Sequence, residues 1–152
     1  MKKIVFLVLL GMAVFFKSCI SFNVQPPSPV QEHLEEIVIC KGVKDVGDTM
    51  VPEQRSDAFS NEDKHVLCFL KMKDISERST LQWIWYSPQR KKVKDTGKFV
   101  VNQDERYLDA VTAYDKLNLG KEKETTGKWT VVIFFNNHFL GKESFLVKSK
   151  KQ

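Results

Sequence analysis

Short segments in which apolar and polar residues alternate recur along most of this chain. The clearest is the range 127–135, where every second residue is large and apolar: Trp129, Val131, Ile133 and Phe135. A period of two places such residues on one face of a β-strand. Asn136 and Asn137 follow as a turn-forming pair, because asparagine tolerates positive φ, and the range 139–147 predicts the returning strand.

The same pattern predicts a protein built from strands. Four further segments are compact and apolar: 36–40, 65–72, 80–86 and 98–101. The range 106–119 has mixed spacing, and we expect strand or irregular structure there. The polar range 45–64 contains several chain-breaking residues and predicts a loop. About seven short strands with turns between them predict an all-β, antiparallel sandwich.

Two groups of residues in this pattern resemble a known kind of domain. Trp83, Trp85, Tyr86 and Pro88 form the motif Trp-x-Trp-Tyr-x-Pro in the middle of the chain. A Gly-x-Trp-x-Val strand and a Phe-x-Val strand close it: Gly127, Trp129, Val131, Phe145 and Val147. These motifs resemble the small immunoglobulin-like domains of exported bacterial proteins, several families of which are uncharacterised. The resemblance implies an immunoglobulin-like β-sandwich over residues 36–148 and brings no catalytic residues with it.

The start of the chain has the pattern of an export signal. Lys2 and Lys3 precede an almost unbroken apolar run of 13 residues, 4–16, and Lys17 closes it. A membrane-spanning helix needs about 20 such residues, so we expect residues 1–18 to be a signal peptide that is removed. A retained membrane anchor is the alternative.

Cys19 is a candidate site of lipid attachment. The range 16–19 resembles the short box of bacterial lipoproteins, whose cysteine is diacylated and becomes the new N-terminus. Ile20 then favours the outer membrane, so we expect an exported, periplasmic or outer-membrane-anchored lipoprotein. Ordinary cleavage nearby, for example after Ser21, is the alternative. The range 19–35 is rich in proline and predicts a spacer between membrane and domain, and 149–152 forms a basic tail.

The charge of the chain depends partly on this leader. The full sequence has 24 basic and 19 acidic residues, and removal of 1–18 leaves 21 basic residues and a net charge of +2. The remaining cations are interspersed with acids, so we expect no nucleic-acid binding. The densest basic cluster predicts a surface patch for anionic headgroups or an acidic partner, with a merely solvated loop as the alternative: Arg90, Lys91, Lys92 and Lys94.

Two cysteines remain for the folded domain. In an exported protein Cys40 and Cys68 could pair as a disulfide. They could equally serve as small buried apolar residues within strands. The sequence leaves both interpretations open.

Catalytic constellations are not evident in the sequence. His33, His65 and His138 lie far from one another and lack metal-ligand spacing, so we expect no metal or other cofactor. Neither a nucleophile elbow nor a phosphate-binding glycine loop is found. We therefore expect a non-enzymatic, membrane-tethered envelope domain that binds or scaffolds an envelope protein. The alternative is a carrier that holds a small apolar ligand or lipid in a sandwich cavity.

Overall fold

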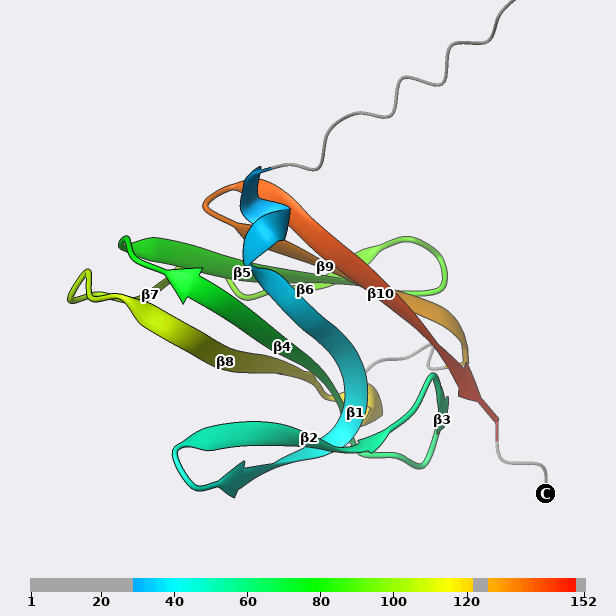
Figure 1. Ribbon diagram of the computed structural model, residues 1–152. Coiled ribbons are helices and arrows are strands. Elements are labelled where there is room, and N and C mark those ends of the chain that lie inside the picture. The colour runs from blue at the N-terminus through cyan, green and yellow to red at the C-terminus, as the bar shows by residue number, and fades with distance from the viewer. Residues whose placement is uncertain (1–28, 122–125, 150–152) are drawn as a thin grey trace, which may run out of the picture.

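The computed structural model describes residues 29–121 and 126–149, and they form two facing β-sheets (Figure 1). The four-stranded sheet has, in spatial order, β2 (Thr49–Arg55), β1 (Leu34–Val46), β4 (Val66–Ile75) and β8 (Leu108–Leu117). The other sheet runs β3 (Ala58–Ser60), β10 (His138–Lys148), β9 (Gly127–Phe135), β5 (Ser79–Tyr86) and β6 (Lys92–Asp95), and β7 (Phe99–Val101) also pairs with β5. All pairs are antiparallel except β3 with β10.

This architecture confirms the predicted antiparallel sandwich. The ambiguous range 106–119 contains a regular ten-residue strand, β8. The prediction of a loop over 45–64 was wrong, because β2 and β3 lie within it. Both are outermost strands of their sheets, where the strand needs hydrogen-bonded partners on one side only and tolerates polar residues and Pro52.

The core between the two sheets is dominated by aromatic rings. Trp83, Trp85 and Trp129 are each fully buried. Phe145 contacts two of these indoles, with ring centroids 6.2 Å from Trp85 and 6.3 Å from Trp129. Each large aromatic ring removes about 150–250 Å² from water. These rings therefore fill the space between the sheets and supply much of the apolar burial.

The β9–β10 hairpin turns where the sequence predicted. Asn136 and Asn137 both have positive φ, 49° and 67°. Two consecutive residues of this kind give the turn whose twist matches that of antiparallel strands. The Asn136 side chain also accepts a hydrogen bond of 2.7 Å from the Thr80 backbone N–H, which fixes the turn to β5.

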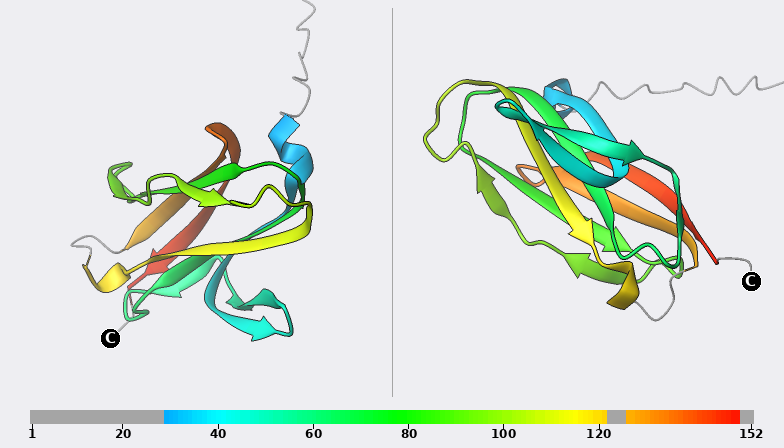
Figure 2. Two further views of the ribbon diagram at one scale, coloured as in Figure 1. Left: turned by 90° about the vertical axis from the view of Figure 1, so that its left-hand side faces the viewer. Right: turned by 90° about the horizontal axis from the view of Figure 1, so that it is seen from below.

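A second, smaller apolar cluster lies on the outer face of the four-stranded sheet. Cys40, Leu67 and Phe69 are buried there, with Val43 and Met50 packed against them. Val43 and Met50 lie near the turn of the β1–β2 hairpin, so this end of the hairpin supplies part of the cover (Figure 2).

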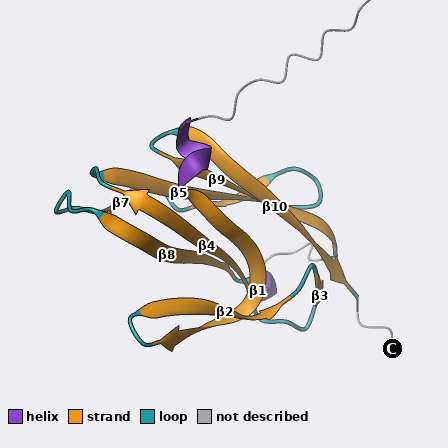
Figure 3. Cartoon of the chain, in the orientation of Figure 1, coloured by secondary structure: helices purple, strands orange, loops and turns teal. Residues whose placement is uncertain are grey.

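Helical structure in the described residues is limited to two short 3₁₀ turns, η1 (Pro29–His33) and η2 (Leu119–Lys121) (Figure 3). Neither has the length of a bilayer-spanning helix. Val30 and Leu34 pack against the main core, so the fold begins before residue 36. The predicted signal peptide, 1–18, and Cys19 lie outside the described residues.

Candidate binding surfaces

A polar groove of about 470 Å³ crosses the outer face of the six-stranded sheet. Trp85, Trp129 and Phe145 point into the core, so their neighbours Tyr86, Thr130 and Ser144 face outward on adjacent strands. These three and five others line the groove: Ser87, Pro88, Arg90, Lys128 and Lys142. Every ionisable residue of the lining other than Tyr86 is a cation.

The loop between β5 and β6 closes one end of this groove. Ser87 N–H donates to the Lys91 carbonyl at 2.9 Å, and Arg90 N–H donates to the Ser87 carbonyl at 2.8 Å. Arg90 has a φ of 61°, which turns the chain tightly. A Cβ on Gly127 would lie 2.8 Å from Pro88 Cβ, so glycine lets this loop sit directly on β9.

The predicted basic patch is divided between two environments. Lys92 pairs with Asp95 at 3.1 Å, and Lys94 pairs with Asp115 at 2.6 Å. Arg90 instead lines the groove beside Lys128, whereas Lys91 is exposed in the loop. The structure thus brings Arg90 together with Lys128 and Lys142, two lysines that the sequence analysis did not include. The sequence signal that could have found them is their position among the outward-facing residues of β9 and β10.

Lys94 belongs to a network that joins the two sheets. The Asp115 carboxylate on β8 accepts hydrogen bonds from Lys94 Nζ at 2.6 and 2.8 Å and from Trp85 Nε1 at 2.7 Å. Lys94 Nζ also donates to the Lys116 carbonyl at 2.7 Å. The network satisfies the polar atom of a fully buried tryptophan, so we assign it a structural role.

Asp95 stabilises the turn that follows β6. Its carboxylate accepts hydrogen bonds from Gln82 Nε2 at 2.7 Å and from Gly97 N–H at 3.0 Å, and it pairs with Lys92. The Gln82 bond, followed by those from Gly97 and Lys92, lowers the pKa of Asp95 to about 2.

Cys40 and Cys68 are free thiols, and their side chains lie on opposite faces of the four-stranded sheet. Cys40 belongs to the outer cluster, whereas Cys68 lies in the main core. Ile39 is paired with Cys68 and Cys40 with Leu67, so the two cysteines are offset by one position and their side chains point away from each other. In the structure Cys40 and Cys68 are therefore small buried residues within strands and form no disulfide with each other. Burial raises the pKa of both thiols.

The histidines do not converge on a metal-binding arrangement. His33 Nδ1 lies 3.1 Å from the Lys73 carbonyl, and its ring packs against Phe135. Over residues 29–121 and 126–149, no three His, Cys, Asp or Glu side chains form a group suited to a metal ion.

A second candidate surface is the free edge of β8. This ten-residue strand pairs with β4 along one side and is outermost in its sheet among the described residues. It contains neither proline nor glycine, and Tyr114 is 44% exposed on its surface. An outer strand presents backbone N–H and C=O groups to which another strand can pair.

Comparisons with known proteins identify no relative. No protein-family model matches the chain, and no curated protein matches it. One similar solved structure is an immunoglobulin-like protein from Pseudomonas aeruginosa, 16% identical, with a TM-score of 0.40, covering 76% of this chain and 98% of that one. Another is an alkylpurine DNA glycosylase from Pseudomonas fluorescens bound to DNA containing an abasic site analogue, 9% identical, with a TM-score of 0.45, covering 60% and 27%. Neither similarity carries a functional argument.

Proposed function

We propose that this protein is a non-enzymatic domain of the bacterial cell envelope, tethered to a membrane, that binds or scaffolds an envelope protein. The observation that supports this function best is the free edge of β8 on a rigid two-sheet body. The partner adds a strand along this edge, so that its backbone continues the four-stranded sheet.

Several features favour β8 as the docking strand. Asp115 and Lys116 at one end of β8 bind Lys94, but its ten residues still give a longer edge than the four of β6 or the three of β3. Its inward residues Val111 and Ala113 pack against the core, which holds the strand in place before a partner arrives. Tyr114 and Tyr107 remain exposed beside the edge and offer apolar contact to the partner's side chains.

The tether follows from the sequence. Lipid on Cys19 anchors the chain, and residues 19–28 separate the anchor from η1. A spacer of this kind leaves β8 accessible to neighbouring envelope proteins.

The alternative, a carrier of a small apolar ligand, has less support. Three fully buried tryptophans and Phe145 occupy the space between the sheets. A carrier would have to open this packed core to admit a ligand, at the cost of its main apolar contacts.

Proline substitution in β8 tests the proposed edge. N–H groups alternate along a strand, so of Thr112 and Ala113 one donates to β4 and the other faces the open edge. We expect one of Thr112→Pro and Ala113→Pro to lower the melting temperature strongly and the other to fold. The folded variant is the test protein, because it removes a donor that only a partner strand would use.

The experiment captures partners from envelope membranes at several salt concentrations, with the full chain as bait. We expect wild type to retain a specific protein and the folded proline variant to lose it. A double variant of the groove, Arg90→Gln with Lys142→Gln, is the control and retains the partner. Absence of any captured protein, or equal capture by the proline variant, contradicts the proposal.

A further inference from the structure

The groove on the six-stranded sheet concentrates positive charge that forms no ion pair with the carboxylates of residues 29–121 and 126–149. Arg90, Lys128 and Lys142 line it, and none of the three forms an ion pair with a described residue. Lys92 and Lys94, close by in sequence, are both paired with carboxylates. The groove therefore differs from an ordinary solvated charge run, in which cations and acids are interspersed.

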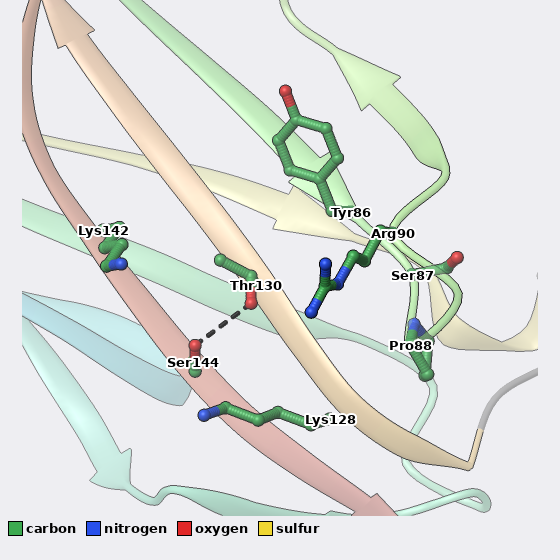
Figure 4. Close-up of a pocket in the computed structure, with 8 residues that line it drawn as sticks. All are labelled: Tyr86, Ser87, Pro88, Arg90, Lys128, Thr130, Lys142 and Ser144. Atoms are coloured by element: carbon green, nitrogen blue, oxygen red, sulfur yellow. Dashed lines mark hydrogen bonds between the residues drawn. The ribbon is translucent and has the colours of Figure 1, made fainter.

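The middle of the groove holds a pair of hydroxyl groups. Thr130 Oγ1 and Ser144 Oγ lie 3.1 Å apart on adjacent strands, where the two residues are direct cross-strand partners. Their mutual hydrogen bond uses one hydroxyl hydrogen, so the other remains available to a ligand. In Figure 4 the side chains of Arg90 and Lys128 extend toward this pair. Cationic and neutral donors thus converge on one region.

The backbone that carries the lining is held in place before any ligand binds. Lys128, Thr130, Lys142 and Ser144 project from paired strands whose inward neighbours are buried in the core. Arg90 sits on a loop closed by two backbone hydrogen bonds and seated on Gly127 through Pro88. A site on rigid elements loses less entropy on binding than one on free loops.

The number and kind of these donors select the ligand. A guanidinium offers five N–H donors and each ammonium offers three, in addition to the hydroxyl groups. A single carboxylate has two oxygens and one charge, too few to engage three cations. A phosphoryl group has three or more oxygens and a charge near −2, and guanidinium matches it in a bidentate geometry.

We infer that this groove binds a phosphate monoester, in which the phosphoryl group is attached to a small organic moiety. The volume of about 470 Å³ exceeds the needs of the phosphoryl group alone and leaves room for the attached moiety beside Tyr86. This inference is independent of the proposed partner strand, because the groove and β8 belong to different sheets.

The test is a titration of the full chain, purified in neutral detergent and followed by amide chemical shifts at constant ionic strength. The probes are glycerol 1-phosphate, inorganic phosphate and succinate, a dicarboxylate of similar charge. We expect saturable shifts at Thr130 and Ser144 with both phosphates, and an affinity at least about tenfold above that for succinate. Tighter binding of glycerol 1-phosphate than of inorganic phosphate supports an organic phosphate monoester, and equal binding supports free phosphate.

Matched variants locate the site. Arg90→Gln and Lys142→Gln should each weaken phosphate binding about tenfold or more. Lys92→Gln removes a cation from the same loop that is paired with Asp95 outside the groove, and it should leave binding within about twofold of wild type. Equal affinity for succinate, absence of saturation, or an equal loss in Lys92→Gln overturns the inference. Equal affinity for succinate would point instead to an acidic protein surface.

Discussion

Removal of the Asp115 side chain should destabilise the protein, because this carboxylate is the acceptor for a fully buried indole. Trp85 Nε1 donates to it at 2.7 Å, and Trp85 has no exposed surface. In Asp115→Ala the indole N–H loses its partner, which costs about 1–3 kcal/mol for a buried polar group. Loss of the partly exposed ion pair with Lys94 adds about 0–1 kcal/mol after solvent screening. We therefore expect a total loss of about 1–4 kcal/mol.

The order among related variants separates these two contributions. Asp115→Asn retains a carbonyl oxygen that can accept from Trp85, so we expect it to lose less stability than Asp115→Ala. Lys94→Met removes the ion pair and leaves the indole satisfied, and it should cost about 1 kcal/mol or less. Asp109→Ala, at an exposed position of the same strand, is the control.

The assay is urea denaturation followed by far-ultraviolet circular dichroism, with the free energy of unfolding taken by linear extrapolation. Asp115→Ala should have a lower denaturation midpoint than Asp115→Asn, and Asp109→Ala should match wild type within about 0.5 kcal/mol. The reasoning is refuted if Asp115→Ala is as stable as the Asp109→Ala control. In that case the indole N–H must find water or another acceptor at little cost.

Three further predictions follow from the core, the thiols and Asp95. Trp129→Ala should lower the free energy of unfolding by about 3–5 kcal/mol, whereas Phe139→Ala at an exposed position should lower it by less than about 1 kcal/mol. A wild-type melting temperature for Trp129→Ala would place Trp129 outside the core. Cys40 and Cys68 should resist alkylation by iodoacetamide at pH 8 in the native protein and react in urea, which peptide mass spectrometry can determine. Alkylation of either thiol in the native protein would contradict its burial. The folded pKa of Asp95 is about 2, so its carboxylate contributes stability that is present above about pH 4 and lost as the pH falls toward 2. The difference in melting temperature between wild type and Asp95→Asn should therefore become smaller over that range. A difference that stays constant would exclude the ionised carboxylate as the source of this stability.

The sequence predicted the sandwich because its core strands alternate clearly. Along β5 and β9 every second residue is buried, and most of these buried residues are tryptophan or another large apolar residue. Such a strand can turn only one of its faces to the core. β2 and β3 escaped prediction because outermost strands need no continuous apolar face. Their formation depends on pairing with β1 and β10, which local pattern does not reveal.

The candidate surfaces were harder to predict, since they depend on register between strands distant in sequence. Arg90 is about 40 residues from Lys128 in the sequence, and the pairing of β5 with β9 places both residues at the same groove. Sequence proximity instead grouped Arg90 with Lys92 and Lys94, whose charges are neutralised by Asp95 and Asp115. The free thiols likewise follow from register, because a one-residue offset places Cys40 and Cys68 on opposite faces.

The proposal that this sandwich works beside a bilayer is tested most directly by the intact mass of the protein purified from membranes. The account predicts a chain that begins at Cys19, carries the added mass of acyl chains, and retains the two thiol hydrogens of its remaining cysteines. A mass that includes residues 1–18, or an unmodified chain released into the soluble fraction, would contradict the tether on which the proposed scaffolding role depends.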